Sequence, residues 1–361
     1  MTTDRPGKKR SRSPYYIILS LLVSCSVFIY LFTRITLDEI TSAIVQIPLN
    51  SIIMFVFFSL AMSTCRTWRY LLLLQSDSTD LRFSSLFLVT LVRNFFSDLL
   101  PARIGTLIYI YIVNKRLNVS LTSATSSFAI CFFFDIIAVS LLGVSASLCY
   151  FSSSRIFLIV MGAGLFIFLC TFLVLYLLPW FLEQIGKLIG KARFLHRLQG
   201  GRLKVIIDDV GREIKITKEA GIYGKVFALS LLVRFFKYVS LYVLFIGLVI
   251  GLGENVKDFP LFRVVSGMIA AELSASLPVS GIAGFGAYEG TWAFVFQLLG
   301  YSEKLAVVTS ISHHLITQVY GYGLGALAML VLLLPVMGPS ERQSDSLGRK
   351  NKRFNFLWSK I

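Results

Sequence analysis

Eight ionisable side chains lie inside or beside the long apolar stretches of this 361-residue chain. Four are basic and four are acidic: Arg93, Arg103, Arg234 and Lys237, and Asp98, Asp135, Glu272 and Glu289. An ionisable side chain costs about 2.5–3.5 kcal/mol in a membrane span on insertion scales, so each one needs a reason to be there. The balance of signs predicts that these groups surround one hydrated cavity, either as a ligand site or as ion pairs between helices.

The basic members of this set suit a phosphate group. Arg93 and Arg103 flank a break in the apolar pattern, and the planar guanidinium of arginine matches phosphate geometry. Arg234 and Lys237 are three residues apart and share a helix face, so they could receive a phosphate or pair with Asp135 or Glu272. We therefore predict that the four basic residues bind a phosphate group. The four carboxylates would balance them or meet a cationic group.

Two histidines in the last apolar stretch suggest a proton relay. His313 and His314 are adjacent and point about 100° apart on a helix, so only one of them can face a shared site. We expect no metal, because a third ligand at suitable spacing is missing from the sequence around them. We also expect no cofactor and no enzyme activity, because the sequence holds no nucleotide-binding motif and no catalytic set.

Two segments break the apolar pattern in the same way. Each begins with Leu-Pro and continues into small, helix-breaking residues; the residues expected to hold the breaks are Pro101, Gly105, Pro278, Gly284 and Gly286. Irregular backbone at membrane depth must be buried in protein or line a wet cavity. Two such breaks in matching positions of two halves point to a transporter-type binding site.

Composition places these residues in a membrane protein. The chain is 56% hydrophobic, with a mean hydropathy of +0.75. Apolar runs of spanning length recur along the chain; we expect spans at 15–33, 51–74, 121–151, 156–181, 226–252 and 306–334, and broken segments at 83–113 and 261–300. Side chains near the end of the second span are expected to anchor it at the interface: Arg66, Trp68, Arg69 and Tyr70.

The net charge of +16 is better explained by the orientation of the chain in the membrane than by nucleic-acid binding. Basic residues cluster at 5–12, 187–225 and 342–360, outside the apolar runs, which predicts that these segments face the cytoplasm. We expect a basic N-terminus (1–14), a transmembrane domain (15–335) and a basic tail (336–361). Within the domain, residues 183–224 form a basic amphipathic segment. Both termini would lie in the cytoplasm, and the protein would be a multi-pass protein of the cytoplasmic membrane.

The number of membrane crossings predicts from which side of the membrane each broken segment enters. If each broken segment returns to its own side, the first enters from the cytoplasm and the second from outside. If each broken segment instead crosses the membrane twice, every loop stays on the same side of the membrane. The distribution of charge therefore does not distinguish the two arrangements. The predicted fold is an all-α integral membrane protein, a polytopic helix bundle with two inverted-topology repeats, each containing a re-entrant or broken helical hairpin.

With these motifs in view, the chain resembles the transmembrane region of lysylphosphatidylglycerol synthase, also called the flippase-like domain family. The resemblance covers about 51–334 and rests on Trp68-Arg69, on the run from Asn94 to Gly105, and on Leu277-Pro278 leading to Gly284-Phe285-Gly286-Ala287-Tyr288-Glu289-Gly290. Four departures from the family pattern stand out. Thr106 replaces a usual acidic residue, Tyr109 an arginine, Phe133 and its neighbours a Glu-Arg pair, and His313 or His314 an arginine of the last span.

The resemblance implies a lipid-handling membrane protein. Some relatives carry an aminoacyltransferase domain, for which these 361 residues leave no room, so we expect a stand-alone member. The predicted function is translocation of a phospholipid or lipid-linked headgroup; the partners would be membrane lipids, either an anionic phospholipid or an isoprenoid-linked glycan, and not nucleic acid. The alternatives are a membrane-embedded transferase or accessory of cell-envelope modification, and a scaffold that uses 183–224 as its partner surface. A homo-oligomer or a cell-envelope enzyme partner is also compatible.

Overall fold

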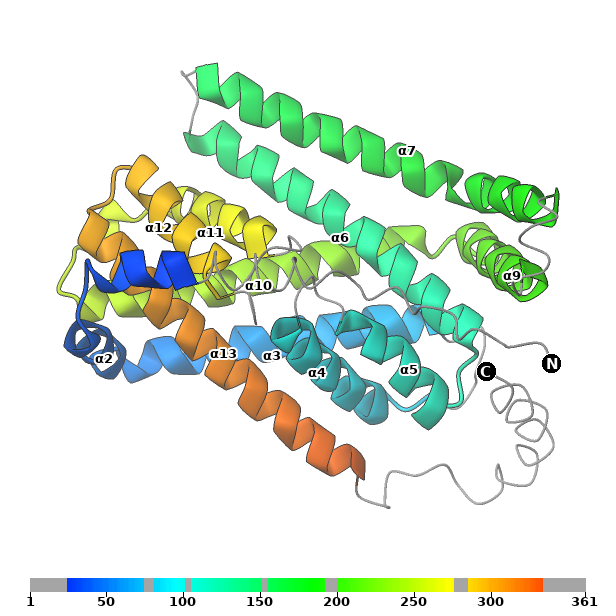
Figure 1. The fold of residues 1–361 in the computed structure, drawn as a ribbon, viewed down its shortest axis with the longest axis horizontal. Coiled ribbons are helices and arrows are strands. Elements are labelled where there is room, and N and C mark those ends of the chain that lie inside the picture. The colour runs from blue at the N-terminus through cyan, green and yellow to red at the C-terminus, as the bar shows by residue number, and fades with distance from the viewer. Residues whose placement is uncertain are drawn as a thin grey trace, which may run out of the picture.

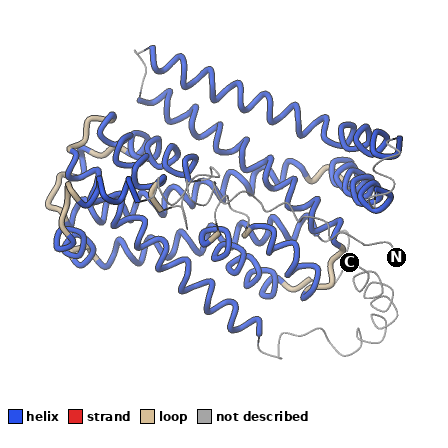
Figure 2. The backbone as a smooth tube through the Cα atoms, in the orientation of Figure 1, coloured by secondary structure: helices blue, strands red, loops and turns tan. Residues whose placement is uncertain are grey.

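The structure, a computed structural model, describes residues 25–74, 81–100, 105–150, 155–191, 200–275 and 285–333. Over these ranges the chain forms helices joined by short loops, with no strand (Figures 1 and 2). The long helices are α3 (Leu49–Leu74), α6 (Leu121–Tyr150), α7 (Arg155–Lys191), α10 (Tyr223–Gly251) and α13 (Glu303–Leu333). The shorter ones are α2 (Leu37–Val45), α4 (Phe83–Leu99), α5 (Thr106–Arg116), α9 (Gly200–Glu219), α11 (Leu261–Ala275) and α12 (Ala287–Leu298), with a 3-10 turn η2 (Val256–Asp258). The all-α prediction is confirmed.

Four helices in the described ranges are long and apolar enough to cross a membrane. They are α3, α10, α13 and the Leu121–Ser145 part of α6. In α7 the stretch Gly164–Leu178 is a shorter apolar helix, and its outward side chains include exposed Phe166 and Phe172. Large apolar side chains exposed along such helices suit contact with lipid. The prediction of a polytopic membrane protein is confirmed.

Local sequence sets where the short helices begin and end. Glu39 and Thr36 form a capping box at the start of α2: the Glu39 N–H donates to Thr36 Oγ1 at 3.3 Å, and the Thr36 N–H donates to Glu39 Oε2 at 2.9 Å. Leu100, which ends α4, is extended, with φ −95° and ψ 137°, as expected for a residue that precedes proline. At the start of α12, Gly286 has φ 99°, a backbone conformation that favours glycine.

The antiparallel pair α3 and α10 forms the centre of the bundle (Figure 1). A Cβ atom at Gly247 would lie 2.7 Å from the Ser51 Cβ, so glycine permits the helices to touch at this end. At the other end, Arg69 of α3 donates to the Ser230 hydroxyl of α10 at 2.7 Å. We name the end that holds α2 and η2 the α2 end, and the opposite end, which holds α9, the α9 end.

The two broken segments form hairpins that start from opposite ends of the bundle. Buried residues of α4 and α5 share a cluster with residues at the α9 end: Leu86, Val89, Tyr109, Val113, Ile214 and Val226. Buried residues of α11 and α12 share a cluster with residues at the α2 end: Val264, Met268, Trp292, Phe296, Phe245 and Phe259. The 11-residue α5 and the 12-residue α12 are about 17–18 Å long at 1.5 Å per residue, short of a hydrocarbon core of about 30 Å. The inverted repeat itself stays a prediction.

The amphipathic segment is used inside the protein. Helix α9 lies against α6 and α7, and its Val210 and Ile214 are buried in the cluster at the α9 end. These apolar residues were expected on a membrane-surface helix that could receive a partner. Because the rest of the bundle already covers them, they offer no partner surface.

Candidate functional site

A central cavity of about 990 Å³ lies among the helices. Its lining comes from α3, α4, α6, α7, α10, α11, α12 and α13, so elements from both halves of the chain enclose it. Leu100 and Ala275, the last described residues before the two breaks, both line it. Apolar helices thus surround a space where both hairpins are interrupted.

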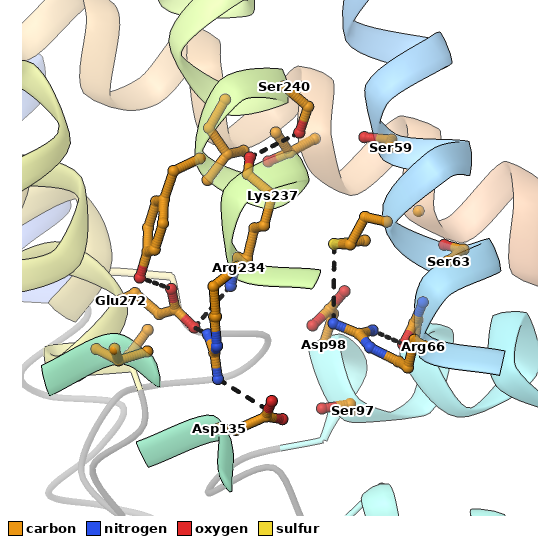
Figure 3. Close-up of a pocket in the computed structure, with 18 of the residues that line it drawn as sticks. Ser59, Ser63, Arg66, Ser97, Asp98, Asp135, Arg234, Lys237, Ser240 and Glu272 are labelled. Atoms are coloured by element: carbon orange, nitrogen blue, oxygen red, sulfur yellow. Dashed lines mark hydrogen bonds and ion pairs between the residues drawn. The ribbon is translucent and has the colours of Figure 1, made fainter. Parts of the chain in front are cut away.

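One wall of the cavity carries a network of ion pairs. Asp135 of α6 accepts two hydrogen bonds from Arg69, at 2.5 and 3.2 Å, and lies 3.7 Å from Arg234 of α10. Glu272 of α11 pairs with Arg234 at 3.0 Å and with Lys237 at 2.6 Å (Figure 3). The network joins α3, α6, α10 and α11. Of the two roles predicted for Arg234 and Lys237, the structure therefore shows the pairing with Asp135 and Glu272.

The opposite wall is formed by α3 and α4 and holds two more arginines. Arg66 donates to the Asn94 side-chain oxygen at 2.6 Å, and Arg93 approaches the same oxygen at 3.4 Å. Among the described residues, neither arginine forms an ion pair, and the Nε of each is buried without a hydrogen-bond partner. Asp98, also on α4, lines the cavity on the same side as Arg66 (Figure 3).

An aromatic stack supports this wall from behind. Tyr70 is fully buried, and the guanidinium groups of Arg69 and Arg93 each lie 5.9 Å from its ring centroid. Tyr109 stacks on Tyr70 with centroids 4.3 Å apart. Tyr109 stands where the family commonly has an arginine. In this chain the position therefore supplies packing beneath Arg93.

Glu289 and His314 form a buried pair beside the second break. Glu289, at 0% exposure, accepts from the Gly286 N–H at 2.8 Å and lies 2.5 Å from His314 Nδ1. The other ring nitrogen of His314 lies 2.7 Å from the Gln318 side-chain nitrogen. His314 thus lies between Glu289 and Gln318, with one ring nitrogen toward each side chain. His314 and Gln318 line the cavity, whereas Glu289 lies behind them.

The predicted site residues divide into three groups. Seven of the predicted residues line the cavity directly: Arg93, Asp98, Asp135, Arg234, Lys237, Glu272 and His314. Glu289 reaches it through His314, while His313 is fully buried, with its ring against Trp292 and its Nε2 at 3.1 Å from the Leu241 carbonyl oxygen. Of the other predictions, Gly105 precedes α5 and Gly286 precedes α12, whereas Pro101, Arg103, Pro278 and Gly284 lie outside the described residues. The proton relay stays a prediction, and only His314 is placed for it.

Two residues of this site were missed. Arg66 and Arg69 were expected to anchor α3 at the membrane interface, and for both the expectation is wrong: Arg69 is 0% exposed in an ion pair and Arg66 lines the cavity. The sequence held a signal, because Ser59, Ser63 and Arg66 follow one another at helical spacing and share one face with Tyr70. Exposed Trp68 alone has the position expected of an anchor.

Comparison with known proteins agrees with these motifs. A comparison with curated proteins found no match. The family model described as the lysylphosphatidylglycerol synthase transmembrane region matches residues 17–325, which include both broken hairpins, the cavity wall of α3 and α4, and most of α13. The chain therefore belongs to the lysylphosphatidylglycerol synthase transmembrane-region family.

Proposed function

We propose that the protein binds the headgroup of a membrane lipid in the central cavity and moves it across the membrane. The observation that carries this proposal is a charged cavity of about 990 Å³ inside an apolar bundle, placed where both hairpins break. Pockets of about 300–1,000 Å³ hold small molecules and headgroups. Charged groups held at such a place are costly, and a polar substrate that must cross hydrocarbon supplies a reason for them.

The charge at the two ends supports an orientation. Lys115 and Arg116 end α5 at the α9 end, and Lys225 lies near the start of α10 there. Asp38 and Glu39 begin α2 at the other end. By the positive-inside rule the α9 end faces the cytoplasm, with both termini on that side of the cytoplasmic membrane. The first hairpin then enters from the cytoplasm and the second from outside.

Translocation can be tested with a variant that fills the cavity. Ser97 of α4 lines the cavity, and tryptophan at this position would occupy part of the space (Figure 3). In liposomes that hold fluorescent phosphatidylglycerol, we expect Ser97→Trp to slow translocation at least about tenfold, because the headgroup loses room in the cavity. The matched control is Ser145→Trp, at an exposed position of α6, which should keep the wild-type rate. No translocation by the wild-type protein, or equal rates in both variants, would contradict the proposal.

Proton coupling through His314 forms part of this proposal. The ring of His314 contacts Tyr288 and Gln318 at the cavity and Glu289 behind it, and of these only Glu289 is a carboxylic acid. We expect an imposed pH gradient to change the translocation rate of the wild-type protein and of His313→Gln. It should leave His314→Gln unaffected, because in the part of the chain that the structure describes the hydrogen bond from Glu289 toward the cavity lining runs to His314. A gradient response that survives in His314→Gln would remove His314 from the mechanism.

A further inference from the structure

The basic side chains of the central cavity fall into two classes. Arg69, Arg234 and Lys237 already have carboxylate partners in Asp135 and Glu272. Arg66 and Arg93 share the neutral side chain of Asn94, and Arg66 also donates to the Met62 sulfur at 3.8 Å; within the described ranges no ion pair reaches either arginine. A ligand anion at the first class must displace a protein carboxylate, whereas at the second class it needs to displace only neutral groups.

We propose that Arg66 and Arg93, bridged by Asn94, form the phosphate-binding subsite of the cavity, and that its ligand is the phosphodiester of a membrane lipid. This inference rests on the proposed function, because it names the part of the substrate that the cavity recognises. It also moves the phosphate site from Arg234 and Lys237 to the wall formed by α3 and α4.

The geometry suits a phosphodiester. Both guanidinium groups approach one oxygen atom, the Asn94 Oδ1, at 2.6 and 3.4 Å, so an anion that replaced this oxygen would contact both arginines. A phosphodiester carries one negative charge on two unesterified oxygens, and guanidinium groups bind such a pair of oxygens bidentately. The Asn94 amide nitrogen adds a further donor. Arg93 lies 5.9 Å from the ring centroid of buried Tyr70, which in turn stacks on Tyr109, so packing restrains this side of the subsite.

The charge balance points to an anion as well. In the described residues in and directly behind the cavity, five basic side chains meet four carboxylates: Arg66, Arg69, Arg93, Arg234 and Lys237 against Asp98, Asp135, Glu272 and Glu289. Among these basic side chains, Arg66 and Arg93 are the two without an ion-pair partner in the described residues, because Asp135 and Glu272 pair with the other three. Apolar side chains such as Leu91 and Ile136 also line the cavity, which favours a phosphate attached to a lipid over a free phosphate ion.

A binding experiment separates these sources. The full-length chain in detergent is titrated with dihexanoyl-phosphatidylglycerol, with dihexanoylglycerol, which lacks the phosphate, and with inorganic phosphate. We expect the phosphatidylglycerol to bind most tightly, and Arg66→Gln and Arg93→Gln each to weaken it at least about tenfold, because each removes charge-assisted hydrogen bonds. Binding of the dihexanoylglycerol should stay unchanged, and Arg66→Lys, which keeps the charge without the fork, should fall between wild type and Arg66→Gln.

The matched control is Arg212→Gln, which removes an exposed arginine of α9 and should bind phosphatidylglycerol like wild type. Wild-type affinity in both Arg66→Gln and Arg93→Gln would overturn the inference. Equal affinity for inorganic phosphate and for the lipid would overturn the assignment to a lipid.

Chemical labelling of the wild-type protein tests the same inference without a variant, and so still applies if a variant fails to fold. Phenylglyoxal modifies accessible arginines, and peptide mass spectrometry reads out each position. We expect phosphatidylglycerol to protect Arg66 and Arg93 but not Arg212, and dihexanoylglycerol to protect none of them. Absence of protection would overturn the inference, even if the protein translocates lipid. Protection without translocation in liposomes would instead count against the proposed function and leave the subsite standing.

Discussion

Arg69 shows how one residue holds three helices of this bundle, α3, α6 and α10. Its fully buried guanidinium binds both carboxylate oxygens of Asp135 and the Ser230 hydroxyl, and Asp135 in turn lies beside Arg234. A buried ion pair contributes little net stability when it is complete, because desolvation offsets the attraction. Removal of one partner is costly, because an unpaired charge then remains in the interior.

At the scale of this pair we expect Arg69→Leu to destabilise the protein by about 3–5 kcal/mol, since Asp135 keeps only its more distant contact with Arg234. Arg69→Met combined with Asp135→Leu should recover most of the loss, because both charges are then absent. The measurement is the unfolding temperature in detergent. Arg212→Ala removes an exposed pair with Asp209 and should change stability by less than about 1 kcal/mol. Additive losses in the double variant would contradict this account.

The individual charges of the site were more predictable than their partners. The costs of burial and the two Leu-Pro breaks indicated that Asp135, Arg234, Lys237 and Glu272 would meet at one cavity. Which side chains pair depends on which helices are neighbours, and this could not be predicted from the sequence. Arg69 was therefore assigned to the interface, because an arginine near the end of an apolar run has the same local pattern in both positions.

At the scale of elements, α13 and α4 are held together by a small residue. A Cβ atom at Gly325 would lie 2.4 Å from the Phe95 Cβ and 3.3 Å from the Leu91 carbonyl oxygen. The two helices can be this close only because Gly325 has no side chain. Gly323, two residues earlier on the same helix, has no atom within 4 Å of the position that a Cβ would take. Gly325 therefore permits a close helix contact, whereas Gly323 meets open space.

These two glycines give a matched pair of substitutions. Gly325→Ala should destabilise the protein by about 1–3 kcal/mol, because the new methyl group forces α4 and α13 apart. Gly323→Ala should be neutral or stabilise by up to about 1 kcal/mol, because alanine favours the helix and meets open space. Thermal unfolding of both variants in the same detergent gives the comparison. Equal effects of the two substitutions would show that the helices repack freely at this contact.

At the scale of the whole molecule, exposed ion pairs tie the α2 end together. Lys304 near the start of α13 binds Glu39 of α2 at 2.6 Å, and Arg34 binds Glu303 at 3.2 Å. The hydrogen bond from Lys304, with that from the Thr36 backbone, holds the pKa of Glu39 below its ordinary value of 4.5. A group with a lowered folded-state pKa adds stability above its ordinary pKa, and this stability is lost as the pH falls.

The contact between Glu39 and Lys304 should therefore depend on pH. We expect Lys304→Met to unfold at a slightly lower temperature than wild type at about pH 7, and the difference should shrink as the pH falls from about 4.5 to about 3. Lys257→Met, at an exposed position of η2, should follow the wild-type curve throughout. If the difference in unfolding temperature between Lys304→Met and wild type stayed constant over this pH range, Lys304 would not be the cause of the lowered pKa of Glu39.

The whole architecture was the most predictable level. Hydropathy and the Leu-Pro breaks indicated the helix bundle and its two hairpins, because membrane depth permits few other arrangements of the backbone. The additional helix α2 and the length of α7 were not expected, since their polar residues resemble those of a loop. Helix α9 was expected as an amphipathic helix, but its cover by α6 and α7 depends on tertiary contacts that periodicity does not encode.

Helix α13 touches both hairpins, and this has a mechanical consequence. Glu289 and Trp292 of α12 are bound to His314 and Thr309 of α13, and Gly325 of the same helix lies against Phe95 of α4. A displacement of α12 would therefore be transmitted to α13 through two hydrogen bonds. It would then reach α4 through the close contact between Gly325 and Phe95. Helix α13 thus contacts both hairpins, which start from opposite ends of the bundle. A shift of one hairpin would thus reach the other through α13.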